Sequence, residues 1–79
     1  MSFEIFSVKV LTEKALSDMR QKRLDLGLSQ QALAEFLDVS VGTVRRWENT
    51  DCVPSLKNMR SIRVFINSSP DDIYKFLNV

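Results

Sequence analysis

The side chains that could do chemistry are concentrated in one stretch of this 79-residue chain, residues 29–49, SQQALAEFLDVSVGTVRRWEN. Its hydroxyl, amide and guanidinium groups donate and accept hydrogen bonds, which suits binding better than catalysis. The chain has no histidine, so the commonest acid or base at neutral pH is absent and a serine–histidine–aspartate triad cannot form. With only Gly27 and Gly42 as glycines, it also has no glycine-rich phosphate loop. We therefore do not expect an enzyme.

The cysteine and acidic residues argue against a metal centre. Cys52 is the only cysteine, so an intramolecular disulfide and a cysteine zinc site are both excluded. Asp71 and Asp72 are adjacent and suit the first turn of a helix rather than a metal ion. We expect no metal and no cofactor. The N-terminus does not have the pattern of a signal peptide and no apolar run is as long as a membrane span, so we expect a cytoplasmic protein without a membrane segment.

Residues 29–49 predict two short helices joined by a tight turn. Ser29 and Ser40 are good N-caps, because a serine hydroxyl accepts a free backbone N–H of the first helical turn. The first helix ends before Asp38, which we expect at the positive φ of the turn, since aspartate tolerates this conformation better than most residues. Helices of about two turns cannot bury an apolar stripe alone, so the two must pack closely on each other.

Each of these helices has an apolar face at helical spacing. Leu33, Ala34 and Leu37 share one face of the first helix, and Val44 and Trp47 share the inward side of the second. Ala34 is the small residue that close packing requires at the crossing. Trp47 shares its face with Val44, so we expect it in the core and not stacked on a base.

A set of residues at matching spacing resembles a known family: Gln30, Ala34, Val39-Ser40, Val44 and Trp47-Glu48, followed by Pro54. They resemble the helix-turn-helix of phage repressors, Cro proteins and the wider XRE-type regulators, over roughly residues 14–66. Asp38 and Thr50 depart from the pattern, because the family often has glycine at these positions. The resemblance implies an all-α fold, a five-helix lambda-repressor-like bundle that binds the major groove of double-stranded DNA.

The start of the second helix is the part expected to read bases, since the major groove admits one helix whose first residues reach base edges. By resemblance, the base-reading positions are Val41, Gly42 and Arg46. Val41 can touch a thymine methyl, Gly42 allows a close approach, and Thr43 can donate, accept or offer a methyl group. Arg46 can make a forked pair with guanine, worth about 1–3 kcal/mol of discrimination. Arg45 can do the same or hold a phosphate.

We expect the DNA backbone to contact the starts of the two helices, where free N–H groups suit a phosphate. The candidate residues are Ser29, Gln30, Gln31 and Ser40. The resemblance also implies an ion pair between Arg23 and Glu48. Arg23 falls close to the apolar face of a helix expected over residues 13–26, and a charge there needs a partner or a path to water. The alternative is that both side chains reach solvent separately.

The basic charge is concentrated around the motif, although the net charge of the chain is only +1. Residues 20–63 hold eight basic and five acidic side chains, a net +3, and the flanks hold three basic and five acidic ones, a net −2. Charge alone does not separate a nucleic-acid surface from solvated charge. The same holds for Lys57, Arg60 and Arg63, which are either a phosphate-facing row or an ordinary solvated face.

The two ends of the chain carry the candidate protein contacts. Residues 1–11 are rich in β-branched and aromatic types, and we expect a short extended arm or edge strand before the helix-turn-helix domain of residues 12–79. Its segment 3–10 could bind a partner protein. At the other end, a last helix starting near Pro70 supplies the candidate dimer contacts, because the corresponding segment often does so in the resembled family: Tyr74, Phe76, Leu77 and Val79.

The sequence therefore predicts a sequence-specific transcriptional regulator, a Cro-like repressor that binds a two-fold operator as a homodimer. It would be found on the nucleoid through its DNA. The alternative is an antitoxin of the same fold, which neutralises a toxin and represses its own operon.

Overall fold

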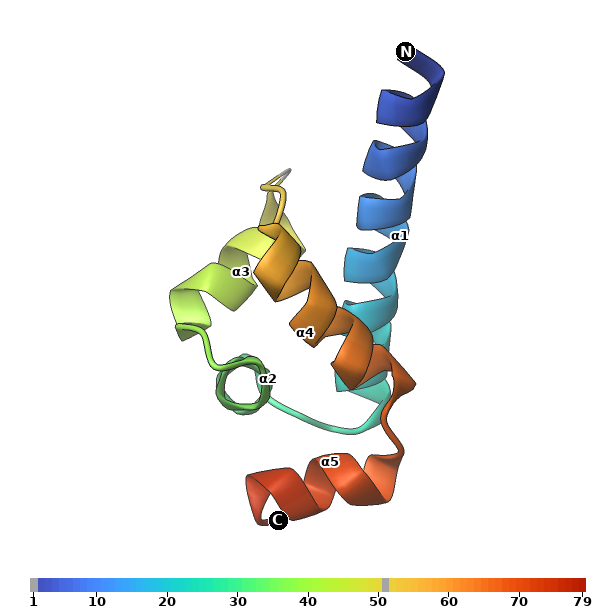
Figure 1. Cartoon of the computed structure of the whole chain (residues 1–79). Coiled ribbons are helices and arrows are strands. Elements are labelled where there is room, and N and C mark those ends of the chain that lie inside the picture. Colours follow the sequence, from blue (N-terminus) through green and yellow to red (C-terminus); the bar gives the residue numbers. More distant parts are fainter. Residues whose placement is uncertain (1, 51) are drawn as a thin grey trace.

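Five helices make up the described part of the computed structural model, which covers residues 2–50 and 52–79 and the side chains from Val10 onward (Figure 1). The helices are α1 (Ser2–Asp25), α2 (Gln30–Leu37), α3 (Val41–Asn49), α4 (Leu56–Asn67) and α5 (Pro70–Leu77). No strand occurs among these residues. The predicted all-α, five-helix bundle is confirmed, and α2 and α3 form the predicted helix-turn-helix.

Serine side chains cap the starts of the four helices after α1. In each case the hydroxyl accepts the backbone N–H three residues later, at 3.0–3.2 Å; the capping residues are Ser29, Ser40, Ser55 and Ser69. Pro70 follows the last of them at the first helical position, where its missing N–H costs no hydrogen bond. The chain thus marks the start of each of these helices with a local hydrogen bond, which fixes where the helix begins.

The turns after α1 and α2 use backbone of positive φ. Gly27 has a φ of +69° and ends α1, as expected for a glycine at this position. Asp38 has a φ of +57° and ends α2, which confirms the expectation that aspartate takes the place of glycine in the turn. The N–H of Val39 then donates to Ala34 O at 3.0 Å and closes the turn. The chain enters α3 immediately afterwards.

The N-terminus differs from the sequence expectation. An extended arm or edge strand was expected over residues 1–11, but α1 begins at Ser2 and runs without a break through residues 11 and 12. No proline or glycine occurs between residues 2 and 11, so nothing stops the helix from extending. A helix also satisfies its own backbone hydrogen bonds, which a lone strand cannot do. Met1 and the side chains of most of the segment 3–10 lie outside the described part.

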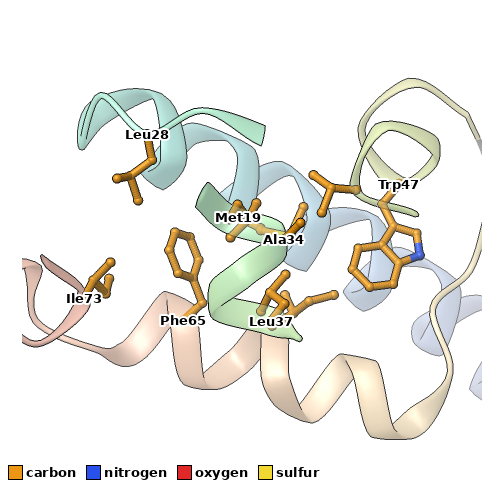
Figure 2. Close-up of a cluster of buried hydrophobic side chains, with 10 residues drawn as sticks. Met19, Leu28, Ala34, Leu37, Trp47, Phe65 and Ile73 are labelled. Atoms are coloured by element: carbon orange, nitrogen blue, oxygen red, sulfur yellow. The ribbon is translucent and has the colours of Figure 1, made fainter. Parts of the chain in front are cut away.

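The core draws side chains from all five helices (Figure 2). Its fully buried members are Met19, Leu33, Val44, Ile62, Phe65 and Ile73. Ala34 and Trp47 are 1% and 5% exposed, so the helix crossing and the inward tryptophan are where the sequence predicts them. Burial of such side chains is the main favourable term that holds short helices together. Packing in the core therefore determines which face of α3 is buried, and the other face of the helix stays exposed.

Two polar side chains, one on α1 and one on α5, attach α4 and α5 to the C-terminal end of α1. The ammonium of Lys22 donates to the carbonyl oxygens of Phe65, Ile66 and Ser68, which lie at the C-terminal end of α4. The last carbonyls of a helix lack the usual backbone partner four residues on, and a cation is favoured there. Burial lowers the pKa of Lys22. On α5, the hydroxyl of Tyr74 donates to Leu26 O at 2.9 Å.

Candidate nucleic-acid interface

A buried ion pair joins α1 to the C-terminal part of α3. Arg23 donates from Nε to Glu48 Oε2 at 2.9 Å and from Nη2 to Glu48 Oε1 at 2.8 Å, in a forked arrangement. Its third nitrogen donates to Leu28 O at 3.0 Å. The side chains of Arg23 and Glu48 are only 10% and 1% exposed. The pair predicted from the sequence is thus present, and the alternative of two solvated side chains is excluded.

The carboxylate of Glu48 also receives groups from two further positions. Gln30 donates from Nε2 to Oε1 at 2.9 Å, and Arg20 Nε lies 3.9 Å from the same oxygen. Burial alone would raise the pKa of Glu48. The hydrogen bonds from Arg23 and Gln30 and the charges of Arg23 and Arg20 outweigh it, so this pKa is lowered. Glu48 is therefore a carboxylate at neutral pH, and it connects α1, α2 and α3.

The C-terminal end of α3 is closed by Thr50, which stands where the family often has glycine. Its backbone N–H and its hydroxyl both donate to Arg46 O, at 2.9 and 2.6 Å. The hydroxyl oxygen also accepts the N–H of Cys52 at 3.3 Å. The backbone of Thr50 is extended, with a φ of −135°, so no left-handed residue is needed. The threonine side chain therefore ends the helix through a hydrogen bond, whereas a glycine ends a helix through a left-handed backbone conformation.

The outer face of α3 carries the five residues predicted to read bases. Gly42, Arg45 and Arg46 are exposed, and Thr43 is half-buried. Val41 is also half-buried and packs against the core, so only part of its surface is available to a thymine methyl. Gly42, Arg45 and Arg46 lie on the side of α3 away from the buried Val44 and Trp47, and Val41 and Thr43 lie at the edges of that side. The structure thus brings the predicted base-reading positions together on one accessible surface.

Gly42 has no structural reason to be glycine. A Cβ atom built there would meet only Ser40 Oγ, at 3.9 Å, which is an ordinary contact. Its φ is not positive, unlike that of Gly27. Glycine within a helix costs stability relative to alanine because the unfolded chain has more freedom to lose. The missing side chain therefore leaves open space on the outside of the helix.

Thr43 is hydrogen-bonded on both sides along this outer face. Its Oγ1 lies 2.9 Å from Ser40 Oγ, and Arg46 Nη2 donates to it at 3.4 Å. Its backbone N–H donates to Ser40 Oγ at 3.2 Å, which is the cap of α3. Ser40, Thr43 and Arg46 thus form a connected polar row on the first two turns of the helix.

The residues expected to meet the DNA backbone divide into two groups. Ser29, Gln31 and Ser40 are exposed at the starts of α2 and α3. Gln30 is half-buried, and its amide is engaged by Glu48. The sequence analysis missed this link between α2 and Glu48. It also missed Arg20, although Arg20 lies three residues before Arg23 and therefore on a neighbouring part of the same helix surface.

Among the residues that the structure describes, no group of three or more histidine, cysteine, aspartate or glutamate side chains could hold a metal ion. Within the same residues, none of the helices combines the length and the apolar character needed to cross a membrane.

Comparison with known proteins places the chain in a family. A family model described as helix-turn-helix matches residues 19–73, which is most of the chain. The protein belongs to this XRE-type helix-turn-helix family, which includes Cro- and C1-like proteins, and the resemblance noted in the sequence is confirmed. Comparisons with curated proteins and with solved structures gave no match.

The family is one of DNA-binding transcriptional regulators and not of enzymes. The protein is therefore a DNA-binding transcriptional regulator of the XRE type. The match spans α2 and α3 entirely, together with the part of α1 that carries Arg23. It thus includes both the ion pair and the exposed row on α3.

The buried Glu48 carboxylate gives the fold a defined pH dependence. Its pKa is lowered in the folded state from an ordinary value of 4.5, so its contribution is complete above that value and is lost as the pH falls through the lowered one. Glu48→Gln should cost about 3–5 kcal/mol at neutral pH, because Arg23 keeps a buried charge without its partner. Its stability should also decline less than that of the wild type between neutral pH and pH ~3.

Urea unfolding at a series of pH values, followed by circular dichroism, measures both effects. The control is Glu35→Gln on the exposed side of α2, which should behave like the wild type. An acid limb in Glu48→Gln as steep as that of the wild type would contradict this role for the carboxylate.

Proposed function

We propose that the protein is a Cro-like repressor that binds a two-fold operator as a homodimer, with α3 in the major groove of each half-site. It acts by binding rather than by catalysis, on the DNA of the nucleoid. The observation that carries the proposal is the division of α3 into two faces. Val44 and Trp47 are buried on one face, and the other presents Gly42, Thr43 and Arg46 to the outside.

The exposed arginines give this face its chemistry. An arginine fork matches the two acceptors of guanine in the major groove, and such a contact is the commonest specific one in protein–DNA complexes. Arg46 lies in the second turn of α3 and is held toward Thr43, whereas Arg45 points elsewhere around the helix and suits a phosphate. Few direct hydrogen bonds to bases are expected, and Arg46 makes the main one.

The helix starts supply the contacts that set the register on the duplex. The exposed Ser29, Gln31 and Ser40 lie beside free N–H groups at the first turns of α2 and α3, where an anion is favoured. Gln30 adds to this set, because its amide has two protons and donates only one of them to Glu48, which leaves the other for a phosphate. Such a contact would join the DNA backbone to the carboxylate that fixes α3.

The end of α5 provides the surface proposed for the homodimer. Phe76 and Val79 are 63% and 81% exposed, and the Phe76 ring lies edge-on to Phe36 with centroids 4.9 Å apart. Leu77 is partly buried beside them, and Tyr74 is tied to Leu26 by its hydroxyl, so it contributes only its ring. A two-fold pairing of this surface would place two α3 helices on half-sites about 34–36 Å apart.

A second function is favoured by the projecting end of α1. The first turns of this helix extend beyond the bundle (Figure 1), and Val10 and Leu11 are 45% and 54% exposed. A groove of about 300 Å³ also lies between α1 and the end of α3, and its lining includes Leu16, Trp47 and Val53. This surface suits a protein partner, as in an antitoxin that also represses its operon. This second function would be favoured if a protein partner binds in stoichiometric amounts and Leu11→Asp abolishes that binding while DNA binding remains.

Selection of bound sequences from a random duplex library at near-physiological salt tests the main proposal. We expect an inverted repeat with a guanine in each half-site at the position under Arg46. Arg46→Ala should lower the preference for that guanine by about 5- to 150-fold, the equivalent of about 1–3 kcal/mol. Arg63→Ala, on the exposed side of α4, is the control and should leave base preference unchanged.

Base reading by Arg46 would be contradicted if no sequence is enriched. It would also be contradicted if Arg46→Ala lowers the affinity for all sequences equally. Binding that disappears steeply with salt and has no sequence preference would indicate attraction to phosphates alone. Enrichment of a single half-site would count against the homodimer and leave base reading intact.

Gly42 offers a separate test in which stability and binding should move in opposite directions. Gly42→Ala should raise the free energy of unfolding by up to about 1 kcal/mol, because alanine has less freedom to lose on folding. The added methyl group would stand between α3 and the floor of the groove, so specific affinity should fall by about tenfold or more. Thermal melts and titrations with the selected duplex measure the two quantities.

The matched control is Gly27→Ala, since Gly27 has a positive φ and lies in the connection between α1 and α2, outside α3. This change should lower stability by about 1–2 kcal/mol and leave the affinity of the folded protein unchanged. Unaltered specific affinity in Gly42→Ala would show that α3 does not approach DNA closely at this point.

A further inference from the structure

The side chains of Ser40, Thr43 and Arg46 are connected in the free protein. Thr43 Oγ1 lies 2.9 Å from Ser40 Oγ and accepts from Arg46 Nη2 at 3.4 Å. The three residues are spaced three apart, so they follow one another along the same side of α3. The first of them is fixed, because Ser40 Oγ also caps the helix by accepting the N–H of Thr43. The row therefore starts from a point that the backbone holds.

We propose that Thr43 is a positioning residue for Arg46: its hydroxyl holds the guanidinium over the outer face of α3 before DNA arrives. This inference rests on the proposed base reading by Arg46. A free arginine side chain loses rotamer freedom when it is fixed on a base, and this loss weakens binding. A hydrogen bond already made in the free protein reduces that loss of rotamer freedom and holds the guanidinium of Arg46 in one orientation.

The two arginines of α3 differ in this respect. Arg46 is held by Thr43, whereas Arg45 makes no hydrogen bond or ion pair with its side chain among the residues that the structure describes. Arg45 also follows Thr43 by two positions, a spacing at which side chains on a helix do not face each other. The arrangement thus gives one arginine a fixed direction, suited to a base, and leaves the other adaptable, as a phosphate contact requires.

A count of hydroxyl protons shows how the row can also accommodate DNA. Ser40 and Thr43 have one hydroxyl proton each, and the bond between their oxygens uses only one of them. Whichever residue donates, one O–H remains available for an acceptor outside the protein. If Ser40 donates to Thr43, the free proton belongs to Thr43, and in the opposite case it belongs to Ser40 and can meet a phosphate.

The test compares Thr43→Val with Thr43→Ser. Valine keeps the shape and removes the hydroxyl, and serine keeps the hydroxyl, whereas the cap of α3 is retained in both because it uses the backbone N–H of residue 43. Selection from the duplex library and titrations with single base-pair changes are run on both variants, on Arg46→Ala, and on the double variant with Thr43→Val. The free proteins are compared by NMR relaxation of the arginine Nε–Hε groups.

We expect Thr43→Val to lower the guanine preference at least threefold, at the same base pair that Arg46→Ala affects. In the Arg46→Ala background it should then have no further effect on that base pair. The Nε order parameter of Arg46 should fall in Thr43→Val, that of Arg45 should not change, and Thr43→Ser should resemble the wild type in all measurements.

Other results overturn the positioning role in distinguishable ways. An altered preference at a different base pair would mean that Thr43 reads a base itself. An unchanged preference and an unchanged Arg46 order parameter in Thr43→Val, with Arg46→Ala still altering the preference, would remove the positioning role and leave base reading by Arg46 intact. If Arg46→Ala itself leaves the preference unchanged, base reading by Arg46 fails, and the positioning role fails with it.

Discussion

The structure depends above all on one buried carboxylate. The side chain of Glu48 is 1% exposed and ionised, so its burial is tolerated only because Arg23 and Gln30 donate to it directly. These partners come from α1 and α2, and Glu48 itself is on α3. Three helices are therefore fixed relative to one another by a single group. A pair of this kind adds little net stability, but removing one partner leaves the other charge buried and unpaired, which is strongly destabilising.

Around this carboxylate, local hydrogen bonds fix where each helix begins and ends. Serine caps start α2 and α3, Asp38 ends α2 in the left-handed conformation, and Thr50 ends α3 through its hydroxyl. The last two positions often have glycine in this family; Asp38 adopts the left-handed conformation itself, and Thr50 ends the helix with an extended backbone and a hydrogen bond from its hydroxyl. The start and the end of α3 are thus both fixed by local hydrogen bonds, from the Ser40 cap and the Thr50 hydroxyl.

The parts predicted from the sequence were those in which neighbouring residues decide the outcome. Serine caps, the apolar faces of α2 and α3, and the positive φ of Asp38 follow from residue type and spacing alone. The Arg23–Glu48 pair needed the family resemblance, because nothing local places residues 25 positions apart in contact. The contacts of Gln30 and Lys22 depend on how distant helices pack, which periodicity does not encode. At the N-terminus, strand preference gave the wrong expectation, because a helix satisfies its own backbone hydrogen bonds and a lone strand cannot.

Methylation interference on the selected duplex tests most directly whether α3 occupies the major groove of a two-fold operator. Methylation of guanine N7 adds a group in the major groove, and methylation of adenine N3 adds one in the minor groove. Guanine N7 methylation should block binding at two symmetric positions, whose centres are about 10 base pairs apart, and Arg46→Ala should abolish the block. Interference from adenine N3 alone, or at one unpaired position, would contradict the account.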